Sequence, residues 1–469
     1  MLLDKTIAEL RSLLSERKIS SRDLVGEAYG NIETFDSALS AFITVREKKD
    51  TLAEADACDS GHSRGPLSGI PFCLKDAYMT KNLRTTAAAK VLDAFVPPYE
   101  ATVSRKLKEN GAILIGKNNM DAWGHGATNE NSDYGPVKNP WDKTRVAGGS
   151  SGGSAAAVSA RMAAFSIGED TGGSIRNPAS MCNIAGLKVT YGRVSRYGTV
   201  AYASSLDTVG PLAKSVEDIA EILEVIAGLD PKDATSSRRK VPPYVKLLDQ
   251  PLKGTRIGIL QEFLGEGADA DVRNVFDGAV KTFESLGARV LPVSMPSLSY
   301  AVPIYHLIAM SETSSNLNRY DGVRFGNNRS FFAEEGMRRV IVGTYALKAG
   351  YHDELYGRAL KGRTVLIREF EALGKDCDIF LGPTLPAIPY LLGDLTADPV
   401  KMLLADIFTV SVNLIGAPAL AIPAGFSRKG LPVGMQIIGK PFDEERILAA
   451  GDAFQRATDW HRKKPKALS

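Results

Sequence analysis

Short apolar runs alternate with amphipathic segments over the first half of the chain, and this alternation is the strongest constraint on its fold. Three runs are short and apolar enough for buried strands: residues 70–74, 112–115 and 163–167. Three segments between or after them have helical patterns: residues 101–110, 151–161 and 215–226. Strands that alternate with helices predict an α/β protein in which helices are layered on a sheet.

The second half of the chain opens with a change of composition and then returns to regular elements. Residues 229–254 are rich in Pro, Lys, Arg and Ser, which predicts a surface linker. A strand–helix–strand unit is expected over 255–293, and residues 300–375 are mostly helical in pattern. The last two apolar runs are separated by SRKGLP, and Gly430 within it is typical of a β-hairpin turn.

Charge and cysteine content exclude several classes of protein. Lys and Arg total 57 against 54 for Asp and Glu, so no field of one sign favours DNA, RNA or an oppositely charged partner. The basic run at 461–466 is expected to be a solvated chain end. The four cysteines form no CxxC pair, so we expect no metal site and a reducing compartment. Without a leader pattern or a run of about 18 apolar residues, we expect a cytoplasmic protein with no membrane span.

Two Gly/Ser loops beside apolar segments are the best candidates for chemistry: GGSSGGS at 148–154 and TGGS at 171–174. The first has the glycine spacing of a phosphate-binding loop, but it lacks the lysine that such a loop needs. It also fits the GxSxG pattern of hydrolases that use a histidine base. Only three histidines follow, none in a distinctive setting: His306, His352 and His461.

A lysine is the remaining candidate for the base. Serine is a weak nucleophile at its ordinary pKa and needs a neighbour that accepts its proton, which a neutral lysine can do. Lys75 directly follows GIPFCL, so a buried strand would deliver it to the interior; a lysine that reaches solvent from a strand end is the alternative. The glycines of TGGS also allow backbone N–H groups to converge on one oxygen, as in an oxyanion hole.

Several long motifs then occur in one order: GIPFCLKD, KNNMDAWGHGATNENSDYGPVKNPWD, GGSSGGSAAAV and GEDTGGSIRNPASMCNIAGLKVTYGRVSRYG. They resemble the amidase signature family, strongly over about 69–213 and more weakly over nearly the whole chain. The resemblance implies a single domain over 1–469. It implies an α/β fold with a large central mixed sheet, helices on both faces, and the 300–375 region over the site.

The resemblance also implies a catalytic site. It makes Ser174 the nucleophile, Ser150 a bridging serine that follows a cis peptide bond, and Lys75 the base. Backbone N–H groups of the second loop would form the oxyanion hole: Thr171, Gly172, Gly173 and Ser174. Asp170 is expected to support that loop, with a simple turn aspartate as the alternative. The two other serines of the first loop are expected to begin a helix: Ser151 and Ser154.

Further stretches resemble one subgroup of the family, the glutamine-hydrolysing subunits of tRNA-dependent amidotransferases: TYGRVSRYGTVAYASSLDTVGPLAKSVEDIAEILEVIAGLDPKDATSS, NLNRYDGVRFG, GTYALKAGYHDELY and GMQIIGKPFDEERIL. This implies glutamine as substrate, with the ammonia used to amidate glutamyl-tRNA(Gln); use of aspartyl-tRNA(Asn) stays open. It also implies amidotransferase B and C subunits as partners, ATP and Mg²⁺ at a partner subunit, and no cofactor in this chain.

Glutamine makes its own demands on a pocket, because its α-carboxylate favours an arginine and its α-ammonium group favours an acid. By the same resemblance, Arg339 binds the carboxylate, Asp406 binds the ammonium group and Tyr305 lines the pocket. Taken alone, each would be an ordinary surface or structural residue. Three departures from the family pattern leave the serine–lysine set intact: Ala147 in place of proline, His125-Gly126 in place of Met-Gly, and a shorter stretch at 325–338.

Two other functions stay open from the sequence. A stand-alone amidase for aryl or alkyl amides would use the same two loops, and the pocket residues would separate it from a glutaminase. A non-catalytic assembly or RNA-binding protein could have kept the fold. Near-neutral charge and the intact set of Lys75, Ser150 and Ser174 argue against that third function.

Overall fold

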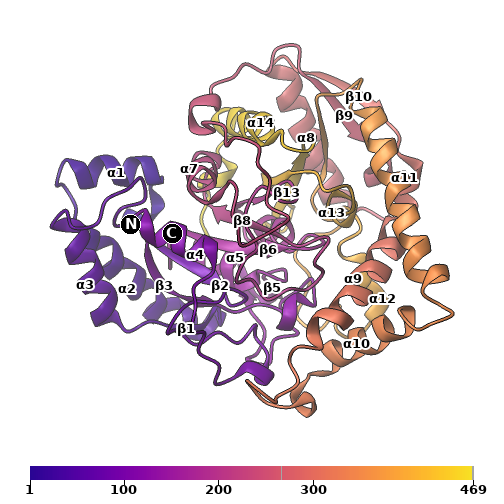
Figure 1. Cartoon of the computed structure of the whole chain (residues 1–469). Helices are drawn as coiled ribbons and strands as arrows, with labels where there is room; N and C mark the ends of the chain where they lie inside the picture. The colour runs from indigo at the N-terminus through magenta and orange to yellow at the C-terminus, as the bar shows by residue number, and fades with distance from the viewer. Residues whose placement is uncertain (266, 467–469) are drawn as a thin grey trace.

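An eleven-stranded sheet runs through the computed structural model, which describes residues 1–265 and 267–466 (Figure 1). The strands lie in this order across the sheet: β1 (Phe42–Val45), β3 (Ile113–Asn118), β2 (Pro71–Lys75), β6 (Phe165–Asp170), β8 (Thr208–Ala213), β7 (Ala185–Lys188), β12 (Ala419–Phe426), β13 (Pro432–Ile438), β11 (Ile379–Pro383), β9 (Arg256–Leu260) and β10 (Arg289–Val293). Strand β2 is parallel to β3 and β6, and β9 is parallel to β10 and β11, whereas the central pairs are antiparallel. The predicted large mixed sheet is therefore confirmed.

Helices cover both faces of this sheet, as predicted. One face carries α7 (Val216–Ile226), α8 (Ala270–Ser285) and α14 (Glu444–Ala457), and the other carries α5 (Gly152–Ser159) and α6 (Arg176–Met181). The alternation of side chains along a strand explains the two layers. On β8, Leu212 packs with the small residues of α5, while Ala213 belongs to the core beneath α7.

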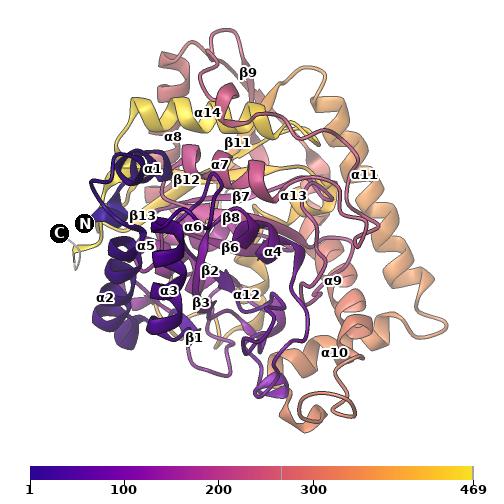
Figure 2. The ribbon, with the colours of Figure 1, turned by 60° about the vertical axis from the view of Figure 1, so that its left-hand side comes forward.

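The N-terminal helices flank the first strands, where Figure 2 draws them in indigo. They are α1 (Ile7–Ser15), α2 (Ser21–Leu39) and α3 (Lys48–Asp59), with α4 (Thr102–Glu109) leading into β3. The two ends of the described chain, residues 1 and 466, lie on the same side of the molecule, and Lys464 of the basic run forms an ion pair with Asp4. That run is therefore partly held by the protein and is not wholly solvated, contrary to the prediction.

The segment 229–254 joins α7 to β9 with only one short helical turn, Val245–Leu247, as a linker would. It is nevertheless fixed to the protein. The Asp230 carboxylate accepts hydrogen bonds of 2.6 Å from the hydroxyls of Thr102 and Ser195, and Tyr244 is fully buried. The composition therefore predicted that this segment has no long helix or strand, but it did not predict that the segment is bound to the rest of the protein.

The predicted helical region is present as α9 (Ala301–Leu317), α10 (Glu334–Ala346) and α11 (Arg358–Leu373), and the shorter helices α12 (Pro399–Leu404) and α13 (Val410–Ile415) follow β11. Helix α10 packs closely on α9 at Gly343, where the absence of a side chain allows the approach. A Cβ there would collide with the Met310 carbonyl. Across the described residues, no helix has both the length and the apolar character needed to cross a bilayer.

A buried ion pair between the loop after β2 and strand β3 gives a test of stability. Lys117 Nζ and Asp76 Oδ1 lie 3.1 Å apart, and both side chains are fully buried. Lys117→Met leaves the Asp76 carboxylate without its cation, so we expect the free energy of unfolding to fall by about 3–5 kcal/mol. Urea unfolding followed by tryptophan fluorescence measures this loss.

The matched control is Arg105→Gln, which removes the solvent-exposed ion pair of Arg105 with Glu109 on α4. Exposed pairs one helical turn apart contribute only about 0.3–0.5 kcal/mol. A loss in Lys117→Met no larger than the loss in Arg105→Gln would show that the buried pair does not stabilise the fold.

Candidate active site

Lys75 and the TGGS loop lie close together because they follow neighbouring strands of the large sheet, whereas the GGSSGGS loop follows β5 (Asp142–Val146) of a separate two-stranded sheet. Strands β2 and β6 are parallel, so their carboxyl ends, Lys75 and Asp170, lie at the same edge of the sheet. The Ser151 N–H donates a 3.1 Å hydrogen bond to the Ser174 carbonyl, which ties the first loop to the second. Ser174 itself is only 7% exposed. The sheet topology therefore brings residues 75 and 174 together, and the hydrogen bonds of the first loop add residue 150.

Lys75 is fully buried and its amino group contacts Ser150. Lys75 Nζ donates a hydrogen bond of 2.7 Å to Ser150 Oγ and one of 3.3 Å to the Glu169 carbonyl. Burial lowers the pKa of Lys75, opposed chiefly by the negative charge of Glu169, whose Oε2 lies 3.6 Å from Nζ. The alternative of a lysine that reaches solvent is wrong, and the predicted pairing of Lys75 with Ser150 is present.

The peptide bond between Gly149 and Ser150 is cis, as expected. Asp121 holds this turn: its N–H donates to the Ser150 carbonyl at 3.1 Å, and its carboxylate accepts from the N–H groups of Asn129 and Asn131 at 2.9 and 3.0 Å. A Cβ at position 149 would collide with the Asp121 carboxylate, so glycine is required there. Burial raises the pKa of Asp121 to about 6.

Asp170 lies at the base of the TGGS loop and is fully buried. Its carboxylate accepts hydrogen bonds from the Gly173 N–H at 2.8 Å, Arg176 Nε at 3.1 Å and Asn413 Nδ2 at 2.9 Å. Burial alone would raise the pKa of Asp170, but the Arg176 guanidinium and the hydrogen bonds lower it to about 2. These contacts go beyond those of a simple turn aspartate and fit the expected support of the loop.

The backbone N–H of Gly173 does not have the oxyanion-binding position that the resemblance implies. Its N–H is engaged by Asp170 within the loop, so it does not point freely at a substrate oxygen. Its φ of +141° and the collision that a Cβ would make with Thr409 explain why glycine is needed. On the other side of the loop, Thr171 Oγ1 donates a 2.7 Å hydrogen bond to Asp207 Oδ1.

The two rival serines lie at the start of α5, as predicted. Ser151 precedes the first helical residue, Gly152, but its hydroxyl does not cap the helix and donates instead to the Glu169 carbonyl at 3.2 Å. Ser154 lies in the first turn, with its hydroxyl 3.4 Å from Asn118 Oδ1. Both side chains are therefore used within the protein.

Two of the predicted pocket residues lie against the TGGS loop. A Cβ added at Gly172 would lie 2.5 Å from the Tyr305 hydroxyl oxygen, and one added at Gly173 would lie 3.2 Å from Asp406 Oδ1. Tyr305 comes from α9, so the helical region does reach the site. Burial raises the pKa of Asp406 to about 7, although Asn177 donates a hydrogen bond of 3.2 Å to its carboxylate.

Arg339 projects from α10 and is buried beside the same pocket. Its Nε donates a 2.6 Å hydrogen bond to Glu335 Oε1, and its Nη1 donates to the Tyr202 hydroxyl. The ring of His125 packs edge-to-face on Tyr202 with centroids 4.7 Å apart, so this departure from the family pattern lies within the pocket. Burial lowers the pKa of His125 well below its ordinary value, which keeps the ring neutral.

Sequence reasoning missed the residues that hold the others in place: Asp121, Glu169, Tyr202, Asp207 and Glu335. Asp121 and Asp207 had a weak signal, since each is a single acid within an apolar or small-residue stretch. Within residues 1–265 and 267–466, no three or more His, Cys, Asp or Glu side chains are grouped so as to hold a metal ion.

The chain belongs to the amidase family, whose sequence profile matches residues 23–448. It is 47% identical, over 99% of each chain, to a protein from Thioalkalivibrio sulfidiphilus that is named as the A subunit of glutamyl-tRNA(Gln) amidotransferase. A protein of the same name from Heliobacterium modesticaldum is 46% identical, again over 99% of each chain. The crystal structure of the protein of that name from Thermotoga maritima matches with a TM-score of 0.85 at 37% identity, over 99% of this chain and 98% of that one. These matches confirm the resemblance seen in the motifs.

The Asp170–Arg176 pair gives a pH-dependent prediction. Asp170→Asn leaves the buried Arg176 without its anion, so we expect the free energy of unfolding to fall by about 3–5 kcal/mol at pH 7. Asp170 has a folded pKa of about 2, below an unfolded value of about 3.9. Its contribution is therefore present above pH 4 and lost as the pH falls toward 2. Urea unfolding at several pH values should show the gap between wild type and variant narrowing over that range.

Asp378→Asn is the control, because Asp378 also has a pKa lowered to about 2 by an arginine, Arg256, but lies nearer the surface. This substitution should lower the free energy of unfolding by about 1 kcal/mol or less. A gap for Asp170→Asn that stays constant down to pH 2 would mean that the charge of Asp170 does not stabilise the loop.

Proposed function

We propose that this chain is the glutamine-hydrolysing subunit of a tRNA-dependent amidotransferase and that it releases ammonia from glutamine to amidate glutamyl-tRNA(Gln). The observation that carries the chemistry is the fully buried Lys75, hydrogen-bonded at 2.7 Å to Ser150 beside the TGGS loop. The choice of substrate is supported by relatives that match over the full length of this chain and bear the name of such a subunit.

The reaction follows from a neutral Lys75. Its amine accepts the Ser150 hydroxyl proton while Ser150 accepts that of Ser174, and Ser174 Oγ attacks the amide carbon of glutamine. Backbone N–H groups of Thr171, Gly172 and Ser174 stabilise the oxyanion, because the Gly173 N–H is held by Asp170. The proton returns through Ser150 to the leaving nitrogen as ammonia departs, and water then releases glutamate from Ser174.

Glutamine would bind between the TGGS loop and the helical region. Asp406 Oδ1 adjoins Gly173 and supplies the acid for the α-ammonium group, and Tyr305 adjoins Gly172 and closes that side. Arg339 supplies the cation for the α-carboxylate. Its hydrogen bonds to Glu335 and Tyr202 leave further guanidinium N–H groups for a ligand, since arginine has five such donors.

The remaining parts of the reaction lie on partners. In this proposal residues 1–469 form a single amidase signature domain that assembles with amidotransferase B and C subunits. A partner subunit binds ATP and Mg²⁺, activates the carboxylate of the misacylated tRNA and receives the ammonia. This chain then contributes the glutaminase activity and no cofactor.

The nucleophile is tested by Ser174→Ala in the complex of this chain with its B and C subunits. We expect glutamine hydrolysis to fall by about 10³-fold or more, because removing a nucleophile removes the covalent route. Labelling of the chain by a fluorophosphonate should be lost in parallel. Release of glutamate and the labelled serine, located by mass spectrometry, are the two measurements.

Ser154→Ala is the matched control, because it removes the hydroxyl of another serine, the last residue of the GGSSGGS loop. We expect its hydrolysis rate to stay within about threefold of wild type. Wild-type activity in Ser174→Ala would overturn the proposed mechanism.

The substrate is tested by Arg339→Ala. We expect kcat/KM for glutamine to fall about 10- to 100-fold, the effect of losing hydrogen bonds to a charged group, with little change for an uncharged amide such as propionamide. Arg358→Ala, which changes an exposed arginine at the start of α11, serves as the control and should leave both rates within about threefold. A wild-type enzyme that prefers propionamide to glutamine would instead indicate a stand-alone amidase.

A further inference from the structure

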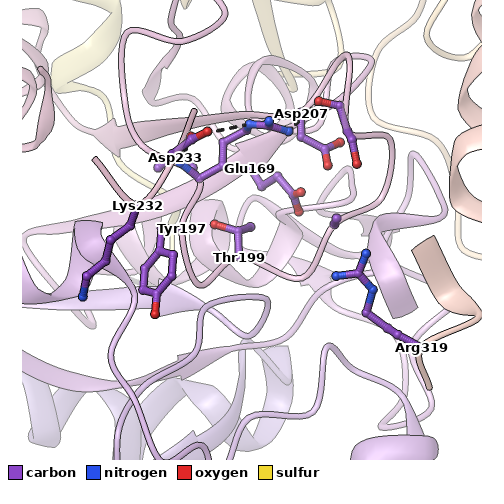
Figure 3. A pocket seen from close by; sticks show the side chains of 11 residues that line it. Glu169, Tyr197, Thr199, Asp207, Lys232, Asp233 and Arg319 are labelled. Carbon is purple, nitrogen blue, oxygen red and sulfur yellow. Dashed lines mark hydrogen bonds and ion pairs between the residues drawn. The ribbon is translucent and has the colours of Figure 1, made fainter. Parts of the chain in front are cut away.

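Glu169, on β6, lines a surface pocket of about 220 Å³ (Figure 3). Glu169, Thr199, Asp207 and Arg319 are among the residues that line it. Tyr305 and Asp406, which adjoin the TGGS loop on the side of the proposed glutamine site, do not. The pocket therefore shares neither of these two residues with the proposed glutamine site.

Glu169 lies between this pocket and Lys75. Its side chain is only 2% exposed, and its Oε2 lies 3.6 Å from Lys75 Nζ. Its other oxygen, Oε1, is buried and has no hydrogen-bond partner among the residues described. The nearby Asp207 differs, because its oxygens accept hydrogen bonds from Thr171, Tyr202 and Ala203. Glu169 is thus the carboxylate that is left to interact with the Lys75 amine.

Other charged and titratable groups interact electrostatically with this pair. Glu169 is affected by Asp207 and Arg196, and the tyrosines Tyr78 and Tyr320 lie near it. Lys75 is affected by Asp121, Asp170 and Asp207. Burial and the charge of Asp207 raise the pKa of Glu169, against the opposing effects of Lys75 and Arg196. Glu169 therefore becomes neutral as the pH falls and carries its charge on the alkaline side.

We propose that Glu169 is a positioning residue for the reaction, the counter-ion that stabilises the ammonium group formed when Lys75 accepts the serine proton. When the Ser150 O–H bond breaks and the Lys75 N–H bond forms, a positive charge appears at a fully buried atom. The Glu169 carboxylate, 3.6 Å away, is placed to balance that charge. The inference rests on the proposed function, because it requires Lys75 to act as a base.

Glu169→Gln tests the proposal, because it keeps the shape of the side chain and removes the charge. Without the anion, the Lys75 ammonium is less stable, so Lys75 loses its proton at lower pH. We expect the acidic limb of the kcat/KM profile for glutamine to move to lower pH by about one to three units. Because Lys75 is then a weaker base, the alkaline plateau should fall by about tenfold. The two profiles should therefore cross.

Three comparisons decide the outcome in the complex with B and C subunits. Glu169→Asp retains a carboxylate and should shift the limb in the same direction by less; it also answers the question if Glu169→Gln does not fold. Glu221→Gln, which changes a buried glutamate of α7 that pairs with Arg11, should leave the limb in place. The proposal is wrong if the acidic limb of the kcat/KM profile of Glu169→Gln coincides with that of wild type. Where only Glu169→Asp folds, the same comparison is made with that variant.

The same experiment separates this proposal from the proposed function. Activity that survives in Ser174→Ala would overturn the serine mechanism, and with it the role of Glu169. Activity that is lost in Ser174→Ala, together with an unshifted limb in the Glu169 variants, would overturn the role of Glu169 alone.

Discussion

Burial of the Lys75 amino group is the constraint on which the rest of the site depends. A buried ammonium is costly unless hydrogen bonds and opposite charges compensate for the lost water, and a neutral amine is favoured where they do so only in part. The sheet provides this intermediate setting. The Ser150 hydroxyl and the Glu169 carbonyl accept hydrogen bonds from Nζ, while the nearest carboxylate oxygen lies 3.6 Å away. This setting supports the role of base that we propose for Lys75.

Loops rich in glycine and serine present many backbone N–H groups, and buried N–H groups need acceptors. Buried aspartates accept part of these hydrogen bonds and hold the segments beside the loops. The Asp170 carboxylate accepts from the Gly173 N–H, and that of Asp207 accepts from the Thr171 hydroxyl and the N–H groups of Tyr202 and Ala203. The Asp121 carboxylate accepts from the N–H groups of Asn129 and Asn131, while its own N–H donates to the Ser150 carbonyl. The second loop is therefore fixed by the carboxylates of Asp170 and Asp207, and the first by the N–H of Asp121. Ser150 and Ser174 thus hold defined positions outside helices and strands.

Local patterns predicted what local forces determine. The strands that end at Lys75 and Asp170, the helix after Ser151 and the hairpin at Gly430 all follow from short stretches of sequence. The residues that were missed act across long separations: Thr171 meets Asp207 36 residues away, and Lys75 meets Glu169 94 residues away. No spacing rule links such pairs, because the sheet order that joins them is set by the whole core. The family resemblance supplied the serines and Lys75, but it gave no reason to single out Glu169.

The residues of the candidate site come from two parts of the chain, and a substitution in one part need not disturb the other. The lysine and serine residues lie at the edge of the sheet, within residues 75–174, where four buried carboxylates surround them. The predicted pocket residues come from the helical region and from the segment between α12 and α13: Tyr305, Arg339 and Asp406. Contact between the two parts is made at Gly172 and Gly173, where the absence of side chains lets Tyr305 and Asp406 approach the loop. In the proposed mechanism, a change in the helices can therefore alter which amide is bound while the path of the proton from Ser174 to Lys75 keeps its geometry.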